Sequence, residues 1–331
     1  MEHPEFRMSV DIPRKKVTIR NILSRIHNSL PRCRVYDPGV LSMLAILFST
    51  MLLHTSPPPP FFQGDGDQKS TKGHALVDVS TDVGWIGPGQ EFHIIVAITP
   101  DAGWHTYWEN PGDSGAPTEI EVGAPEGYRV GKPIFPRPEI FITANETTYG
   151  YSKQVAIFIP VKAPSSTLDG RADFQVTTAW LACKKSCVQG EETSTITISV
   201  RAWEEGPIRK SKSIQRWQES LPHPLSELEN GSVRIVGNFL KITGTTKYRH
   251  VGFLGIEKSG VRFTNTNTLE IIGDSFTISV PVNLDPSNAT DDTFEIAGLL
   301  TLGRNLVDPS YTVTLIVEQN TTRYFSKGVE K

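Results

Sequence analysis

The chain alternates apolar and polar residues over Ala172-Asp-Phe-Gln-Val-Thr-Thr-Ala-Trp180 and again over Thr193-Ser-Thr-Ile-Thr-Ile-Ser-Val200. A period of two is typical of a β-strand with one buried face, and it places Phe174, Val176 and Thr178 on the same side. A short connection separates the two runs. We therefore predict that they pair as an antiparallel hairpin.

Further β-branched and aromatic runs precede this hairpin and are bounded by Gly-Pro-Gly and Pro-Asp turns. They cover residues 75–79, 91–98 and 151–161. In the last run, a period of two places Val155 and Ile157 on one face. Several strands at this spacing, over roughly 125 residues, predict a β-sandwich of immunoglobulin-like size.

The pattern changes once after the hairpin. Residues 208–220 carry apolar side chains at helical spacing and are followed by Pro222 and Pro224, which predicts a helix that connects two domains. Strand patterns then return over 233–242, 248–257, 269–272, 276–282, 294–302 and 311–318. The predicted class is all-β, with a sandwich over 74–200, a connector over 201–229 and a second, smaller β-domain over 230–331.

The N-terminus has the pattern of a targeting segment. A basic region precedes an uncharged apolar run of 14 residues, 40–53, which is shorter than the roughly 20 residues that span a bilayer. We expect residues 1–56 to be a signal peptide or an N-terminal membrane anchor, with a buried core helix as the alternative. Residues 57–73 are rich in Pro and Gly and are expected to form an extended tether.

Charge excludes one class of partner. The 33 Lys and Arg residues against 36 Asp and Glu residues give a net charge of −3, whereas nucleic-acid-binding domains usually carry a basic surface. We expect no nucleic-acid partner and no cofactor.

Two cysteines carry the candidate chemistry. Cys183 and Cys187 lie in the hairpin connection, while Cys33 precedes the apolar run. Residues four apart in an extended strand are about 13 Å apart, so a bond between the two sulfurs requires a turn-like bend. Lys184 and Lys185 place positive charge beside the sulfurs, which favours the reactive thiolate.

Three interpretations of this pair are open. A structural disulfide that closes so small a ring contributes roughly 2 kcal/mol, less than one that closes a long loop. A small ring at an exposed tip is better suited to thiol–disulfide exchange, which we favour. A metal site is disfavoured because two cysteines leave half of a tetrahedral site empty.

The order of three segments resembles a known family. They are Ala102-Gly-Trp-His-Thr-Tyr-Trp-Glu-Asn-Pro-Gly-Asp-Ser-Gly115, Thr148-Tyr-Gly-Tyr-Ser-Lys-Gln-Val-Ala-Ile-Phe-Ile-Pro160 and Trp180-Leu-Ala-Cys-Lys-Lys-Ser-Cys-Val188. Together they resemble the N-terminal periplasmic domain of the thiol:disulfide interchange protein DsbD, especially the variant in DsbD-like and suppressor-of-copper-sensitivity proteins. The resemblance is close over 73–200 and loose over 201–331.

The resemblance implies an immunoglobulin-like sandwich whose cysteine pair shuttles two electrons. In the family, the second cysteine forms the mixed disulfide with a partner and the first resolves it, which assigns these roles to Cys187 and Cys183. It also places His105 and Tyr107 beside the sulfurs. A cap loop over the pair corresponds to residues 145–151, centred on Tyr149 and Gly150, but Thr147 and Thr148 replace an acidic residue and Phe there.

The resemblance further implies a periplasmic protein-disulfide reductase-type electron carrier. Its donor would be a membrane-embedded or thioredoxin-like protein, and its acceptors would be exported disulfide-handling proteins. Relatives continue into a membrane domain and a thioredoxin-like domain, neither of which is recognisable in this sequence, so we expect a separate donor protein. The alternatives are a non-catalytic two-domain scaffold with a structural disulfide and a copper-handling accessory, for which no Met-rich or His-rich site is evident.

Overall fold

The structure is a computed structural model that describes residues 72–143, 145–209, 211–264, 267–288 and 293–318. The expected targeting segment and nearly all of the expected tether lie outside these residues. Within the described ranges, none of the helices combines the length and apolar character that a membrane crossing requires.

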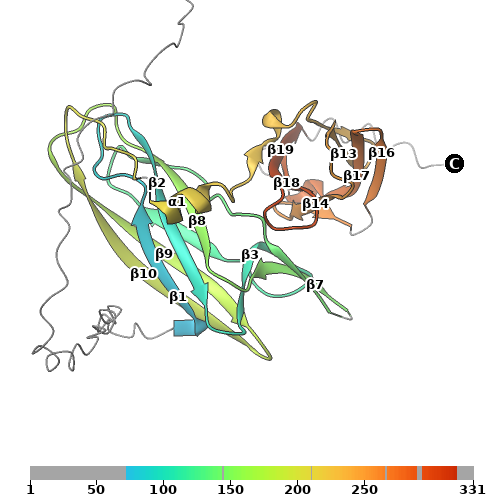
Figure 1. The fold of residues 1–331 in the computed structure, drawn as a ribbon, viewed down its shortest axis with the longest axis horizontal. Coiled ribbons are helices and arrows are strands. Elements are labelled where there is room, and N and C mark those ends of the chain that lie inside the picture. The colour runs from blue at the N-terminus through green and yellow to red at the C-terminus, as the bar shows by residue number, and fades with distance from the viewer. Residues whose placement is uncertain (1–71, 144, 210, 265–266, 289–292, 319–331) are drawn as a thin grey trace, which may run out of the picture. The chain divides into compact units, whose positions relative to one another are not determined.

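The N-terminal half of the described chain is built from two antiparallel sheets (Figure 1). One sheet has the order β1-β2-β8-β5, and the other has the order β10-β9-β3-β7-β6, with β4 also pairing with β9. After a short 3-10 turn, η1 (Lys72–His74), the strands are β1 (Ala75–Thr81), β2 (Glu91–Pro100), β3 (His105–Gly112), β4 (Glu119–Gly123), β5 (Arg129–Val130), β6 (Glu139–Ile142), β7 (Thr147–Tyr151), β8 (Val155–Lys162), β9 (Gly170–Cys183) and β10 (Cys187–Val200).

The two sheets share one apolar core, which confirms the all-β class predicted from the sequence. Phe92 and Ile157 from the first sheet pack in one cluster with Phe174 and Trp180 from the second. Phe174 and Val176 are fully buried, as the alternation over 172–180 predicted.

Strands β2 and β8 are buried on both faces, which the predicted alternation did not include. The single α-helix of the described chain, α1 (Lys212–Gln218), covers their outer face (Figure 1). Its Ile214 packs against Ile95, Ala156 and Phe158. The helix is shorter than the predicted 208–220 because the Ser211 hydroxyl caps it by accepting the Ile214 N–H at 3.1 Å.

The predicted strand over 151–161 is divided. Tyr151 ends β7 in one sheet and Val155 begins β8 in the other. The intervening residues therefore carry the chain from sheet to sheet, a change that continuous β-branched composition does not reveal.

The C-terminal half of the described chain also forms two sheets, with the orders β11-β19-β18-β14 and β12-β13-β17-β15, and with β16 on β17. The predicted strand over 233–242 is a hairpin that turns at Gly237, whose φ is +60°. The elements are β11 (His223–Pro224), η2 (Leu225–Glu227), β12 (Ser232–Val236), β13 (Phe239–Thr245), β14 (Val251–Ile256), β15 (Val261–Phe263), β16 (Thr268–Ile272), β17 (Ser275–Leu284), η3 (Pro286–Asn288), β18 (Thr293–Leu302) and β19 (Ser310–Glu318).

The predicted hairpin of residues 172–200 is confirmed as β9 and β10, which pair from Gly170↔Val200 to Cys183↔Cys187. Near its tip the Trp180 indole N–H donates to the Gly73 carbonyl at 2.9 Å. Gly190 lies against the same ring, because a Cβ at this position would come within 2.3 Å of it. These contacts hold the cysteine end of the hairpin against η1.

Candidate functional site

A disulfide joins the ends of the two longest strands. Cys183 is the last residue of β9 and Cys187 is the first of β10, and the two face each other in register with their Cα atoms 4.1 Å apart. The chain reverses over Lys184–Ser186, where the Lys184 N–H donates to the Ser186 carbonyl at 3.1 Å. This is the turn-like bend that the spacing of the two cysteines requires.

The two sulfur-bearing residues differ in exposure. Cys183 is 4% exposed, whereas Cys187 is exposed to solvent. The sheet order explains the difference, since β9 lies between β10 and β3, while β10 is an edge strand. An incoming thiolate can therefore approach Cys187 more readily than Cys183.

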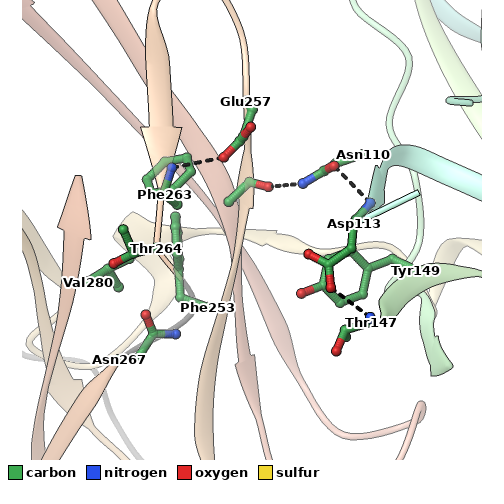
Figure 2. Close-up of a pocket in the computed structure, with 12 residues that line it drawn as sticks. Asn110, Asp113, Thr147, Tyr149, Phe253, Glu257, Phe263, Thr264, Asn267 and Val280 are labelled. Carbon is green, nitrogen blue, oxygen red and sulfur yellow. Dashed lines mark hydrogen bonds between the residues drawn. The ribbon is translucent and has the colours of Figure 1, made fainter. Parts of the chain in front are cut away.

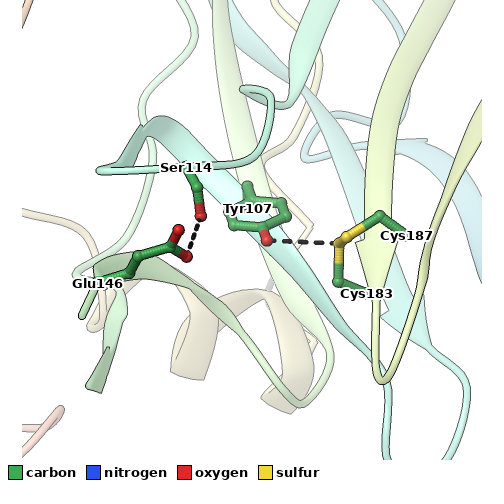
Figure 3. Close-up of a disulfide and its surroundings, with 5 residues drawn as sticks. All are labelled: Tyr107, Ser114, Glu146, Cys183 and Cys187. Atoms are coloured by element: carbon green, nitrogen blue, oxygen red, sulfur yellow. Dashed lines mark hydrogen bonds between the residues drawn. A yellow bond between two sulfur atoms is a disulfide. The ribbon is translucent and has the colours of Figure 1, made fainter. Parts of the chain in front are cut away.

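Tyr107 supplies a hydrogen-bond donor to the buried sulfur. Its phenol O–H donates to Cys183 Sγ at 3.4 Å (Figure 3). Burial, and to a lesser degree the charge of Glu146, raises the pKa of Tyr107, so the phenol stays protonated. A hydrogen bond to sulfur favours the thiolate over the neutral thiol.

The segment around Gly115 packs on the Tyr107 ring. Gly115 has a φ of +97°, and a Cβ on it would lie 2.5 Å from the ring. Next to it, the Ser114 hydroxyl donates to the Glu146 carboxylate at 2.8 Å (Figure 3). Thr118 Oγ1 also donates to the Tyr107 carbonyl at 2.6 Å. Gly115 thus packs on the Tyr107 ring, while Thr118 bonds the Tyr107 backbone.

His105 is the cross-strand neighbour of Cys183 in the β3–β9 register. Its ring meets the Tyr107 ring edge-on at 5.3 Å and stacks on Phe141 of β6 at 4.6 Å. Burial lowers the pKa of His105, and this outweighs the opposing effect of the Glu139 carboxylate. The imidazole is therefore neutral at neutral pH.

The segment expected to form a cap loop is mostly the strand β7. Gly150 lies opposite Tyr107 in the β3–β7 register, and a Cβ there would come within 2.0 Å of the Thr106 carbonyl oxygen. Strand alternation directs Tyr149 to the other face, where its ring contacts Trp108 at 6.2 Å. Tyr149 also lines a pocket with Asp113 and Thr147 (Figure 2).

The two lysines lie at the hairpin tip and are exposed. Lys184 Nζ donates to the Ala102 carbonyl at 3.4 Å, so this ammonium group turns toward the loop between β2 and β3.

Of the site residues predicted from the sequence, the structure brings together Cys183, Cys187, His105 and Tyr107, with Gly150 beside them. It places Tyr149 on the opposite face of the sheet. No group of three or more His, Cys, Asp or Glu side chains among the described residues could hold a metal ion.

Two residues of this site were not predicted from the sequence. Phe141 lies in Glu139-Ile-Phe-Ile142, a four-residue strand whose apolar composition alone does not connect it to His105. Gly115 lies in the Gly- and Pro-containing segment 110–117. Nothing in the sequence of this segment indicates that Gly115 contacts the ring of Tyr107. The Asp-Ser-Gly turn over 113–115 was the available hint that the chain folds back there.

These features define a class: a two-sheet β-sandwich that holds, at the end of one sheet, a cross-strand disulfide with one exposed and one buried cysteine. Residues 75–199 match the family model for the N-terminal domain of the thiol:disulfide interchange protein DsbD. The resemblance read from the sequence is thus confirmed over the first sandwich.

Similar solved structures include the N-terminal periplasmic domain of ScsB from Proteus mirabilis, at 19% identity and a TM-score of 0.47, covering 74% of this chain and 94% of that one. The sporulation control protein Spo0M from Bacillus subtilis matches at 10% identity and a TM-score of 0.21, covering 77% and 94%. No curated protein matches the chain.

Proposed function

We propose that the Cys183–Cys187 pair carries out thiol–disulfide exchange and passes two electrons from a donor protein to acceptor proteins. The observation that carries this proposal is the unequal exposure of the two cysteines. Cys187 is open to attack, while Cys183 is buried and accepts the Tyr107 hydrogen bond. The match of residues 75–199 to the DsbD N-terminal family supports the same chemistry.

Reduction begins when a donor thiolate attacks Cys187 Sγ. The Cys183–Cys187 bond breaks, and its electron pair leaves on Cys183 Sγ, where the Tyr107 O–H stabilises the new thiolate. A second donor thiolate then attacks the donor sulfur of the mixed disulfide and releases Cys187. The donor ends as a disulfide, and this protein ends as a dithiol after two protons are taken up.

Oxidation by the acceptor runs the same route in reverse. The Cys187 thiolate attacks an acceptor disulfide, and Cys183 then attacks Cys187 Sγ and expels the reduced acceptor. Exposure favours Cys187 as the partner-linked residue, because a partner bonded to the buried Cys183 would have to displace the Tyr107 side chain that contacts this sulfur.

A purely structural role for the bond is less well supported. Antiparallel pairing already joins β9 and β10 from Gly170 to Cys183. A disulfide ring of about five residues at the tip therefore adds roughly 2 kcal/mol at most to the free energy of unfolding. A structural disulfide also does not require a buried hydroxyl donor to one of its sulfurs, such as the Tyr107 phenol.

We place the module in the periplasm, with a membrane-embedded or thioredoxin-like donor in trans and exported disulfide-handling proteins as acceptors. Support comes from the apolar run 40–53 with its basic flank and from the match to the DsbD family.

Trapping tests the proposed exchange. In the full chain, Cys183→Ser leaves Cys187 able to form a mixed disulfide that cannot be resolved internally. We expect this variant, expressed in a cell envelope, to accumulate partner adducts that a reductant releases. Cys187→Ser is the matched control and should accumulate far fewer. If both variants form equally few adducts, the proposal that this cysteine pair exchanges disulfides with partner proteins is wrong.

A further inference from the structure

The buried sulfur requires a way to gain and lose a proton. A cysteine thiol with an ordinary pKa of about 8.5 is mostly protonated at neutral pH, and burial in an apolar site disfavours the thiolate further. If the exchange proposed above takes place, Cys183 must lose its proton before it closes the disulfide and regain one after reduction. At 4% exposure, this residue has little direct access to water.

Most charged and titratable groups near the site are occupied or unsuitable as proton acceptors. On β6, Glu139 accepts hydrogen bonds from the N–H and the hydroxyl of Ser152, both at 2.9 Å. Glu146 accepts from Ser114. Tyr107 stays protonated, and the hairpin lysines Lys184 and Lys185 are cations.

His105 differs from these groups in position and in bonding. As the direct cross-strand neighbour of Cys183, it carries its Cβ about 4.5–5.5 Å from that of the cysteine. Its ring nitrogens form no hydrogen bond or ion pair with the described residues. By contrast, His74, His93 and His223 each bond a carboxylate.

We infer that His105 accepts the proton of Cys183 Sγ when the disulfide closes and returns it when the disulfide is reduced. In the closing step, a ring nitrogen of neutral His105 takes the thiol proton. The Cys183 thiolate then attacks Cys187 Sγ of the mixed disulfide, and the acceptor's cysteine leaves with the electron pair of the broken bond. The imidazolium releases its proton to solvent, which restores the neutral ring.

Phe141 is a positioning residue for this step. Its ring stacks on one face of the imidazole and contributes to the burial that lowers the pKa of His105. A neutral ring is ready to accept a proton at neutral pH, and a disfavoured imidazolium gives the proton up again.

Ring closure can be timed with 5,5′-dithiobis(2-nitrobenzoic acid), an aromatic disulfide that releases a coloured thiolate. The full chain is used with Cys33→Ser, because Cys33 would otherwise release an equivalent of its own. Reaction of the reduced protein releases one equivalent when Cys187 attacks and a second when Cys183 closes the ring. The variant is His105→Gln, which keeps a polar side chain but has no base. The matched control is His93→Gln, at a half-buried histidine in the other sheet.

We expect His105→Gln to slow the second phase about 100-fold at pH 7, at the lower end of the range for general acid–base catalysis. Its rate should then rise about tenfold per pH unit, following the thiolate fraction. The first phase should change less than about twofold, and His93→Gln should retain wild-type kinetics. If His105→Gln does not fold, His105→Tyr, which keeps an aromatic ring against Phe141, takes its place.

An unchanged second phase with a wild-type pH profile in the His105 variant would overturn this inference and leave the proposed exchange intact. If wild-type Cys187 gives no first phase, or if its disulfide resists every thioredoxin-like reductant, the proposed exchange itself fails.

Discussion

At the scale of single residues, the Tyr107 hydroxyl distinguishes the two sulfurs, since it donates to Cys183. Tyr107→Phe removes this donor with little change in shape. We expect the thiolate of the reduced pair to lose roughly 1 kcal/mol of stabilisation, which corresponds to a reduction potential about 20 mV more negative. Equilibration with glutathione measures the potential.

Tyr128→Phe is the control for this change, because Tyr128 packs edge-on against Phe174 in the core of the same sandwich. Its potential should equal that of the wild type. A Tyr107→Phe potential identical to the wild type would mean that the hydrogen bond does not contribute to the redox balance.

Gly115 tests whether the contact on the Tyr107 ring is needed for stability. Gly115→Ala introduces both a left-handed backbone cost, at φ +97°, and a Cβ 2.5 Å from the ring. We expect a loss of about 2–3 kcal/mol in the free energy of unfolding, measured by urea denaturation.

Gly89→Ala separates the two causes. Gly89 has a φ of +67° but no heavy atom within 4 Å of its Cβ position, so its loss should be limited to about 1 kcal/mol of backbone cost. Equal losses in the two variants would show that the segment around Gly115 does not press on Tyr107.

At the scale of elements, β3 joins the candidate site to a half-buried carboxyl. His105 and Tyr107 lie in its first half, and Glu109 follows on the same strand. Burial raises the pKa of Glu109 to about 6, against the smaller opposing effects of Lys258 and Lys132. Between the ordinary value of 4.5 and about 6, the folded protein therefore binds more protons than the unfolded chain, and its stability falls as the pH rises.

Glu109→Gln removes this dependence. At pH 7 the variant should be more stable than the wild type by up to about 2 kcal/mol, because 1.5 pKa units correspond to that free energy. At pH 4 the two should unfold at similar urea concentrations. Glu119→Gln, at an exposed position of the neighbouring β4, should change neither value, and a Glu109→Gln variant that is less stable at pH 7 would contradict the assignment.

Long strands with clear alternation were predictable at this scale, and short strands were not. The β9–β10 hairpin follows from its period of two, since Phe174 and Val176 face a core while their neighbours face solvent. Strands β3 to β6 lie in a Gly- and Pro-rich region with few apolar repeats. The register of β3, β4 and β5 depends on pairing with β9 and β8, which are distant in sequence, whereas β6 pairs with the next strand, β7.

At the scale of the whole molecule, the bent tip that carries the two cysteines was predictable, but their unequal exposure was not. The spacing of Cys183 and Cys187 predicts a bent tip, and the family resemblance implies their separate roles. Which of the two is buried depends on the sheet order, because β3 covers one side of β9 while β10 remains at the edge. Alternation within a strand cannot distinguish an inner strand from an edge strand.

The reduction potential of the Cys183–Cys187 pair in the full chain is the most direct test of the central claim. An exchange module must lie within reach of thioredoxin-like partners, so we predict a value between about −270 and −120 mV, where such proteins operate. A value below about −300 mV, typical of structural disulfides in secreted proteins, would show that the bond only holds the hairpin tip and would contradict the proposed electron transfer.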